Sequence, residues 1–273
     1  MARNWIPALG RNRKDDRVDK GTIAGITLAV GGIVAGLLLE GGKIGQIVQP
    51  TAAMIVLGGT LGAVMVQFPL ATVMQAFKGL GSVFFGRSED PRDMAKTLVG
   101  FAHRARKNGI VSLDPELANI KDPFLKKALM LAVDGIEPVE LRKMMELELD
   151  NQAEYSEKIA QVFESAGGFA PTIGIIGAVL GLIQVMQHLS NIDEVGKGIA
   201  VAFVATLYGV GSANLIFLPS SGKLKIRGRE EQILREMTLE GVISILEGMN
   251  PRILETKLLG YMREPQRPEP QPA

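Results

Sequence analysis

The sequence predicts an all-α membrane protein: four transmembrane helices, with an all-α cytoplasmic domain inserted between helices 2 and 3. Charged residues make up 22% of the chain, yet four long runs contain none: residues 21–39, 44–77, 165–187 and 198–222. Each run is close to, or longer than, the ~20 residues that cross a hydrocarbon layer as a helix. A soluble domain would distribute its charges along amphipathic helices instead.

The basic residues predict the orientation of these spans. Of the 30 Lys and Arg residues, 28 lie before the first run, between the second and third runs, or after the fourth. The positive-inside rule therefore places both termini and the large loop in the cytoplasm. A cleaved signal peptide is disfavoured, because the first run ends at Glu40 with no small-residue cleavage motif after it.

The first two helices fall within residues 21–70, after a basic cytoplasmic tail at 1–20. The second helix begins near Pro50, a residue suited to the first turn of a helix, and ends near Pro69. Both spans carry a G-x-x-x-G spacing, at Gly32 and Gly36 and at Gly58 and Gly62. Small residues at such a spacing let helices approach closely in lipid, which favours a bundle.

The loop at 71–164 predicts a helical cytoplasmic domain. One helix begins after Asp90 and ends at Gly109, and a second begins at Asp122. A third begins near Pro138 and leads into the third span. The third and fourth spans occupy 165–222, and a cytoplasmic C-terminal part follows at 223–263. That part contains an amphipathic helix at 230–248, which either folds back onto the loop helices or pairs with a neighbouring subunit. The proline-rich end, 264–273, is expected to be disordered.

The residue inventory argues against an enzyme. The chain has no cysteine and only two histidines, His103 and His188, on opposite sides of the predicted membrane. It shows no nucleophile–base pair, metal-ligand cluster or phosphate-binding glycine loop. We expect no catalytic residue, no metal, no cofactor and no nucleic-acid partner.

Ion transport by the isolated chain is also disfavoured. None of the four runs contains Asp, Glu, Lys or Arg, whereas a carrier of protons needs an ionisable group within the bilayer. Either the protein moves no ions, or a partner supplies the essential carboxylate.

Spans 3 and 4 carry a pair of motifs. Span 3 contains Ala-Pro-x-x-Gly-x-x-Gly-x-x-x-Gly from Ala170, and span 4 contains Ala-x-x-Ala-Thr-Leu-x-Gly from Ala202, with Pro219 ten residues after Gly209. With this topology, residues ~20 to ~250 resemble the MotA/PomA family of flagellar motor stator subunits, distant relatives of ExbB and TolQ.

The resemblance implies that a partner chain supplies the membrane carboxylate that this chain lacks. In the family, several copies surround a dimer of a MotB-type partner in the bacterial inner membrane, in contact with lipid. The partner's transmembrane aspartate carries the ion, and the resulting motion produces torque on a rotor switch protein of the FliG type.

The resemblance also assigns residues. Pro171 and Pro219 match the family's functional prolines, and Thr206 matches the threonine facing the ion path. Sodium-type members carry a threonine at the place of Ala178, so alanine favours protons, although Thr206 and Thr172 keep their hydroxyls.

In the loop, Arg106 matches the rotor-facing arginine. Asp114 stands where many members have glutamate, so either Asp114 or nearby Glu116 is the functional acid. The alternative is that these are ordinary solvated surface charges.

Two other functions compete with the stator hypothesis. An ExbB/TolQ-like energy transducer for an outer-membrane process is disfavoured, since those relatives have three spans with the loop after the first. A membrane scaffold without ion flux should tolerate Thr206→Val, whereas an ion path should not. The copy number, the individual partner and a second stator system are not predicted.

Overall fold

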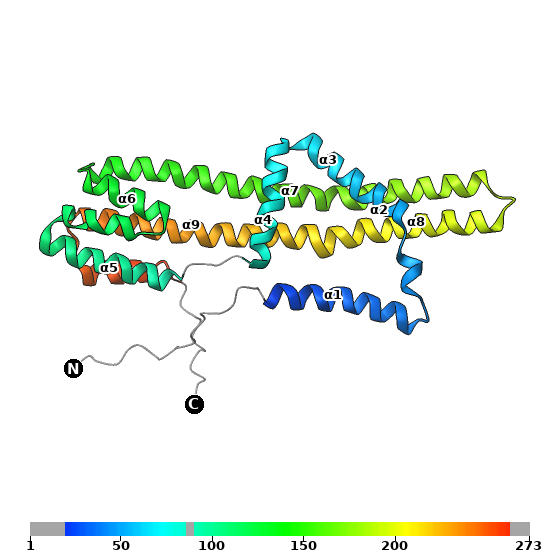
Figure 1. The fold of residues 1–273 in the computed structure, drawn as a ribbon, viewed down its shortest axis with the longest axis horizontal. Helices are drawn as coiled ribbons and strands as arrows, with labels where there is room; N and C mark the ends of the chain where they lie inside the picture. The colour runs from blue at the N-terminus through cyan, green and yellow to red at the C-terminus, as the bar shows by residue number, and fades with distance from the viewer. Residues whose placement is uncertain (1–19, 86–89, 263–273) are drawn as a thin grey trace, which may run out of the picture. The chain divides into compact units, whose positions relative to one another are not determined.

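The computed structural model describes residues 20–85 and 90–262, and every regular element in these ranges is a helix (Figure 1). Within these ranges, four helical stretches are long and apolar enough to cross a membrane: Gly21–Leu39, Pro50–Gln67, Pro138–Gln187 and Ile192–Leu246. The predicted fold class, an all-α protein with four membrane helices, is thereby confirmed. The predicted tails at 1–20 and 264–273 lie outside the described residues, apart from Lys20.

The chain divides into two compact units, which we describe separately. Their described parts are residues 20–85 with 163–220, called the spanning unit, and residues 90–162 with 221–262, called the polar unit.

The spanning unit begins with α1 (Lys20–Leu39), a turn at Gly41 and the short 3-10 helix η1 (Ile44–Ile47). The second span then consists of α2 (Pro50–Ala53), the π-helical turn η2 (Met54–Gly58) and α3 (Gly59–Gln67). It ends because Pro69 keeps the preceding residue, Phe68, in an extended conformation (φ −120°, ψ 146°). After this break α4 (Leu70–Phe85) starts.

The third and fourth spans belong to very long helices. The predicted helix from Pro138 does lead into the third span, as the single 50-residue helix α7 (Pro138–Gln187). The fourth span is α8 (Ile192–Ser212), followed by the π turn η4 (Ala213–Phe217) and α9 (Leu218–Leu246). The prediction of a separate helix at 230–248 was wrong in its start, because helical backbone continues from α8 through η4 into α9.

The polar unit contains α5 (Pro91–Asn108), η3 (Ile110–Asn119), α6 (Pro123–Val133), the first half of α7, most of α9, and α10 (Pro251–Leu259). The predicted helix starts are confirmed by their caps: an Asp90 carboxylate oxygen accepts from the Arg92 N–H at 2.9 Å, and Asp122 accepts from the Leu125 N–H at 2.6 Å. Helix α10 was not predicted.

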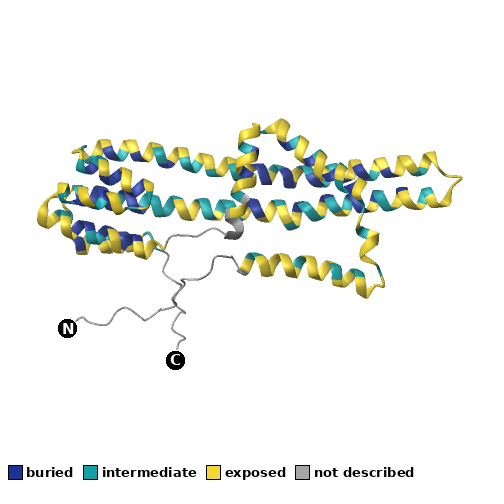
Figure 2. Cartoon of the chain, in the orientation of Figure 1, coloured by how far each residue is buried: buried dark blue, intermediate teal, exposed yellow. Residues whose placement is uncertain are grey.

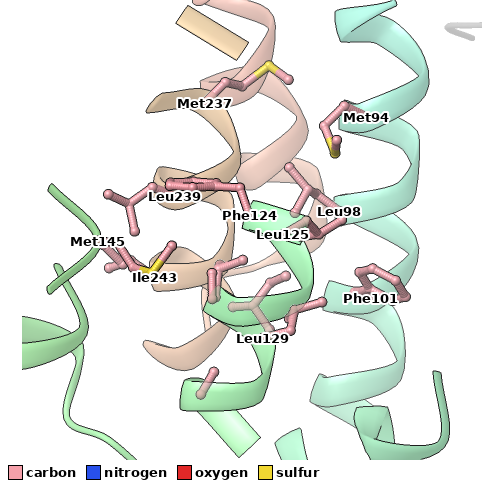
Figure 3. Packing of buried hydrophobic residues seen from close by; sticks show 14 of the residues in the cluster. Met94, Leu98, Phe101, Phe124, Leu125, Leu129, Met145, Met237, Leu239 and Ile243 are labelled. Carbon is pink, nitrogen blue, oxygen red and sulfur yellow. The ribbon is translucent and has the colours of Figure 1, made fainter. Parts of the chain in front are cut away.

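Large apolar side chains fill the interior of the polar unit (Figure 3). Leu98 and Phe101 of α5, Leu125 and Leu129 of α6, and Ile243 of α9 all belong to one buried cluster. Helix α9 approaches α5 closely at Gly241, where a Cβ atom would lie 2.7 Å from a methyl group of Leu98. The C-terminal helix therefore folds onto the loop helices, which was one of the two predicted alternatives.

Candidate functional site

Helices α7 and α8 lie side by side and meet along a seam of small residues (Figure 1). An ideal Cβ placed on Gly209 would lie 2.6 Å from the Ala170 carbonyl oxygen. An ideal Cβ placed on Gly181 would lie 2.7 Å from the Gly198 carbonyl oxygen. The two backbones are thus in direct contact, as small residues permit in membrane helices. We call this contact the glycine seam.

The G-x-x-x-G spacings noted in the first two spans play no such part within the chain. A Cβ on Gly32, Gly36, Gly58 or Gly62 would meet nothing within 4 Å. The glycines that make close contacts lie in the third and fourth spans instead.

The two predicted prolines occupy neighbouring turns at one end of the seam. Pro171 lies inside α7, and its missing N–H leaves the Gly167 carbonyl without the usual donor four residues on. Gly167 packs against Leu218, since a Cβ on Gly167 would lie 2.6 Å from Cδ2 of Leu218. Leu218 immediately precedes Pro219, so the structure brings the two proline turns together.

Pro219 is the second residue after the π turn η4. The Leu218 N–H donates to the Ala213 carbonyl, five residues back instead of four. A π turn is a local widening of the helix that is common at functional sites and bends. Both prolines therefore sit where the helical hydrogen-bond ladder is interrupted, and neither ends the helical backbone, which continues past both.

Thr206 and Ala178 lie on the same seam. The Thr206 hydroxyl donates to the Ala202 carbonyl at 3.2 Å, and a Cβ on Gly174 would lie 3.5 Å from Cα of Thr206. Ala178 is half-buried and adjoins Gly177, where a Cβ would lie 2.7 Å from that of Ala205. Three of the four predicted ion-path residues thus flank contacts of the seam, and Pro219 adjoins its end.

The second span covers this seam. Ala52 and Val56 form a buried cluster with Val204 and Ala205 of α8. Beside them the Tyr208 hydroxyl donates to the Ile47 carbonyl at 2.6 Å and accepts from the Gln49 N–H at 3.2 Å. The sequence shows Tyr208 as a polar residue in a span, but its partners lie about 160 residues away in the chain and could not be inferred.

The chemistry available at the seam is limited to hydroxyls and backbone carbonyls. The four charge-free runs supply no Asp, Glu, Lys, Arg or His, and no cluster of acidic or histidine side chains that could hold a metal occurs within residues 20–85 and 90–262. Such a site can orient water or an ion, but it cannot hold a proton through a cycle at neutral pH.

The predicted rotor-facing residues lie on the polar unit, and the structure separates the two candidate acids. Arg106 is exposed in the last turn of α5, and Asp114 is exposed on η3 beside the fully buried Leu113. Glu116 forms an ion pair with Arg104. Neither Arg106 nor Asp114 forms an ion pair among the described residues. Of the two candidate acids, Glu116 is thus the one that is paired within the polar unit.

An ionic network that the sequence did not predict joins three helices of the polar unit. Glu240 of α9 accepts hydrogen bonds from Arg142 of α7 at 2.8 Å and from Lys257 of α10, which also donates to Ser244. Burial acts to raise the pKa of Glu240, but the hydrogen bonds from Lys257 and Arg142 outweigh it, so the pKa is lowered. The hydrogen bond to Glu240 likewise raises the pKa of Arg142.

Similar proteins give the context of this arrangement. Residues 23–109 match the motility protein A N-terminal family, and residues 116–237 match the MotA/TolQ/ExbB proton channel family. Motility protein A of Bacillus subtilis is 35% identical over 90% of this chain and 91% of its own length.

Two solved structures are also similar. MotAB of C. jejuni superimposes with a TM-score of 0.86 at 32% identity, covering 92% of this chain and 99% of that one. The flagellar MotAB stator complex of Bacillus subtilis superimposes with a TM-score of 0.82 at 35% identity, covering 90% and 96%.

Fold and site together define a class: a helical membrane subunit whose spans form a small-residue seam and lack a charge carrier of their own. The chain belongs to the MotA/TolQ/ExbB proton channel family, on its motility protein A branch. It is therefore a subunit of the inner membrane, of the kind that forms proton-conducting stators.

Proposed function

We propose that this flagellar motor stator subunit conducts protons together with a MotB-type partner, whose membrane aspartate binds the proton, and converts the proton-motive force into torque. The observation that carries the proposal is the glycine seam. It places Pro171, Ala178 and Thr206 beside one helix contact, in runs (165–187 and 198–222) that contain no Asp, Glu, Lys, Arg or His. A site of this kind needs a carboxylate from another chain. No bond chemistry is proposed, so the protein is not an enzyme.

The seam is suited to movement because its contacts are backbone against backbone. Two helices whose side chains interdigitate can shift only if those side chains repack. Glycine surfaces carry few side chains that would have to move past the neighbouring helix. When the partner's aspartate gains a proton, its negative charge disappears. The neutral side chain is then best solvated by a different arrangement of α7 and α8 from the one that best solvates the charged side chain. The interrupted ladders at Pro171 and Pro219 are the places where the helices can bend.

The proposed ion is the proton. Ala178 offers no side-chain oxygen beside the seam, which leaves the Thr206 hydroxyl oxygen as the side-chain ligand among these residues. Dehydrating a sodium ion requires several oxygen ligands, whereas a proton requires only an acid and a short path of water.

The assembly proposed is a ring of copies around a partner dimer, with both termini and the polar unit in the cytoplasm. In the single chain α1 is almost wholly exposed and strongly apolar, as expected for a helix that meets lipid or a neighbouring copy (Figure 2). On the polar unit, Arg106 and Asp114 are proposed to contact a FliG-type rotor protein. Charged contacts of this kind steer association and weaken with salt.

The test is motility in a cell that lacks its own stator and receives this chain with its MotB-type partner. We expect wild type to restore swimming without sodium, and Pro171→Leu and Thr206→Val to abolish it or reduce it severely. Arg106→Glu should also fail, whereas Lys126→Glu, a matched charge reversal on α6, should swim. Failure of a correctly inserted wild-type complex would indicate a transducer for another machine instead.

The choice between the two acids can be tested separately. Asp114→Lys should impair torque, and a compensating charge reversal in the rotor protein should restore it. Glu116→Gln should instead act by releasing Arg104, with no rescue from the rotor side. Rescue of a Glu116 variant but not of an Asp114 variant would reverse the assignment.

A further inference from the structure

The hydroxyl of Thr60, in the second span, lacks the hydrogen bond that a threonine in a helix ordinarily makes. Thr97, Thr206, Thr238 and Thr256 each donate to the carbonyl four residues earlier, at distances of 2.8–3.2 Å. Thr60 also lies in a helix, and its side chain is buried, with only 2% of the residue exposed. Its hydroxyl nevertheless has no hydrogen-bond partner. A buried polar group without a partner is costly and calls for a functional explanation.

The π turn η2 explains why the usual partner is not used. The carbonyl four residues before Thr60 belongs to Val56, which lies inside η2. In this turn the Gly59 N–H donates to both the Ile55 and the Val56 carbonyls. A π turn inserts extra backbone into one turn of helix, so residues four apart no longer lie directly above one another. The geometry of this turn differs from that of a regular α-helix, and the Thr60 hydroxyl makes no hydrogen bond to the Val56 carbonyl.

Thr60 lies on the face of the second span that packs onto the glycine seam. Ala52, Val56, Thr60 and Val64 of this span are all buried. The adjacent Gly59 faces Ile173, since a Cβ on Gly59 would lie 2.8 Å from a methyl group of Ile173.

The contacts of η2 extend to both helices of the seam. Ile173 is two residues from Pro171, and a Cβ on Gly177 would lie 3.3 Å from a methyl group of Ile55, inside η2. On the α8 side, Val56 packs in one cluster with Ala205, the neighbour of Thr206. A movement of α7 against α8 must therefore be accommodated at η2.

We infer that Thr60 is a positioning residue of the proton-driven cycle, with a hydroxyl that is unpaired in this state and bonds to the Val56 carbonyl in the other. When η2 tightens into regular α-helix, Val56 returns to the position four residues below Thr60, and the bond forms. The gain of that bond favours the tightened state, and the wide state is held by the packing of Ile55 and Gly59 on α7. The second span is thus a two-state element coupled to the seam. This inference rests on the proposed stator function.

The experiment compares Thr60→Val, Thr60→Ser and Thr27→Val in motors driven by this chain and its partner. Valine keeps the shape of threonine and removes the hydroxyl, whereas serine keeps the hydroxyl. Thr27 is an exposed threonine of α1 and controls for the loss of a hydroxyl from a membrane helix. The readouts are the amount of complex recovered with the partner, the stall torque per stator unit and the rotation speed near zero load.

Removing an unpaired buried hydroxyl should not harm folding, so Thr60→Val should assemble at the wild-type level. We expect its speed near zero load to fall at least threefold, because the cycle loses the bond that favours one of its two states. The stall torque per unit should change much less. Thr60→Ser should recover most of the speed, and Thr27→Val should match wild type.

The possible outcomes distinguish failure of the role inferred for Thr60 from failure of the proposed stator function. If wild type restores torque and Thr60→Val rotates at wild-type speed, the role of Thr60 is refuted while the stator function stands. Loss of assembly in Thr60→Val would also refute it, since the residue would then be structural. If wild type assembles with the partner but produces no torque, the proposed stator function fails first.

Discussion

The polar unit and the spanning unit are both helical, but the internal contacts of the first are made by large side chains and those of the second by small ones. In the polar unit, Leu98, Leu129, Leu141 and Met145 are fully buried and belong to one continuous cluster. In the spanning unit, the contact between α7 and α8 is made by glycine and alanine.

The difference follows from the solvent around each unit. In water, burying apolar surface contributes about 25 cal/mol per Å², so large side chains stabilise most. Lipid tails are as apolar as leucine, so membrane helices gain mainly from close backbone contact. The comparison teaches that the polar unit resists internal change, while the seam combines close packing with few side chains to rearrange.

The largest expected effect on this comparison comes from opening a cavity in the polar unit. Leu98→Ala removes three buried carbons between α5 and Gly241, and should lower the free energy of unfolding of this unit by about 2–5 kcal/mol. Hydrogen exchange of α5 amides in the full chain would report the change. Val139→Ala, at a side chain that is 66% exposed, should stay within about 0.5 kcal/mol. Similar losses in both variants would contradict the account of the core.

The next effect comes from adding one methyl group to the seam. A Cβ at Gly209 would lie 2.6 Å from a backbone oxygen, which cannot move aside as a flexible side chain can. Gly209→Ala should therefore destabilise the assembled complex by about 1–3 kcal/mol and reduce torque.

Gly211 provides the matched control on the same helix, because its Cβ would meet nothing within 4 Å. Gly211→Ala should be neutral, or stabilising by up to ~1 kcal/mol through helix propensity. Thermal unfolding of the complex would measure both variants. Tolerance of Gly209→Ala would show that the seam is looser than described.

A smaller effect is expected from the ionic network. Glu240→Gln keeps one carbonyl oxygen for hydrogen bonding but removes the charge between Arg142 and Lys257, and should cost about 1.5 kcal/mol. Glu255→Gln, at an exposed position on α10, should change little. Denaturant unfolding of the polar unit followed by hydrogen exchange would distinguish them, and equal values would contradict a stabilising network.

The smallest effect is the dependence of the same unit on acid. The pKa of Glu240 is lowered from its ordinary value of 4.5, so its contribution to stability is present above that value. This contribution is lost as the pH falls through the lowered pKa of the folded state. Wild type should therefore lose more stability than Glu240→Gln over this acid range. Parallel pH profiles of the two proteins would refute the assignment.

The fold was predictable where local signals sufficed. Charge-free runs located the spans, and Pro50, Pro91 and Pro123 each begin a helix as expected. The continuity of the fourth span with α9 was missed because the segment 223–229 is rich in Lys and Arg. This segment shows no apolar periodicity that would indicate a helix, and it contains no proline that would end one. The Glu240 network was missed because Arg142 lies 98 residues away in the chain.

The candidate site was predictable in its residue types but not in its pairing. A glycine spacing is the same signal in every span, and only the structure shows that the glycines of α7 and α8 meet while Gly32 and Gly58 meet nothing. The unpaired hydroxyl of Thr60 depends on the π turn η2, for which the sequence around Met54–Gly58 carries no marker.

The double hydrogen bond of Tyr208 has a consequence for the kind of membrane this protein suits. By holding the backbone on both sides of Val48, it fixes the height at which the second span enters beside α8. That span has 18 residues and is about 27 Å long. With its N-terminal end fixed, it cannot slide to match a thicker bilayer and must tilt, or the lipid around it must thin. Stator output should therefore depend on acyl-chain length, and Tyr208→Phe should weaken that dependence.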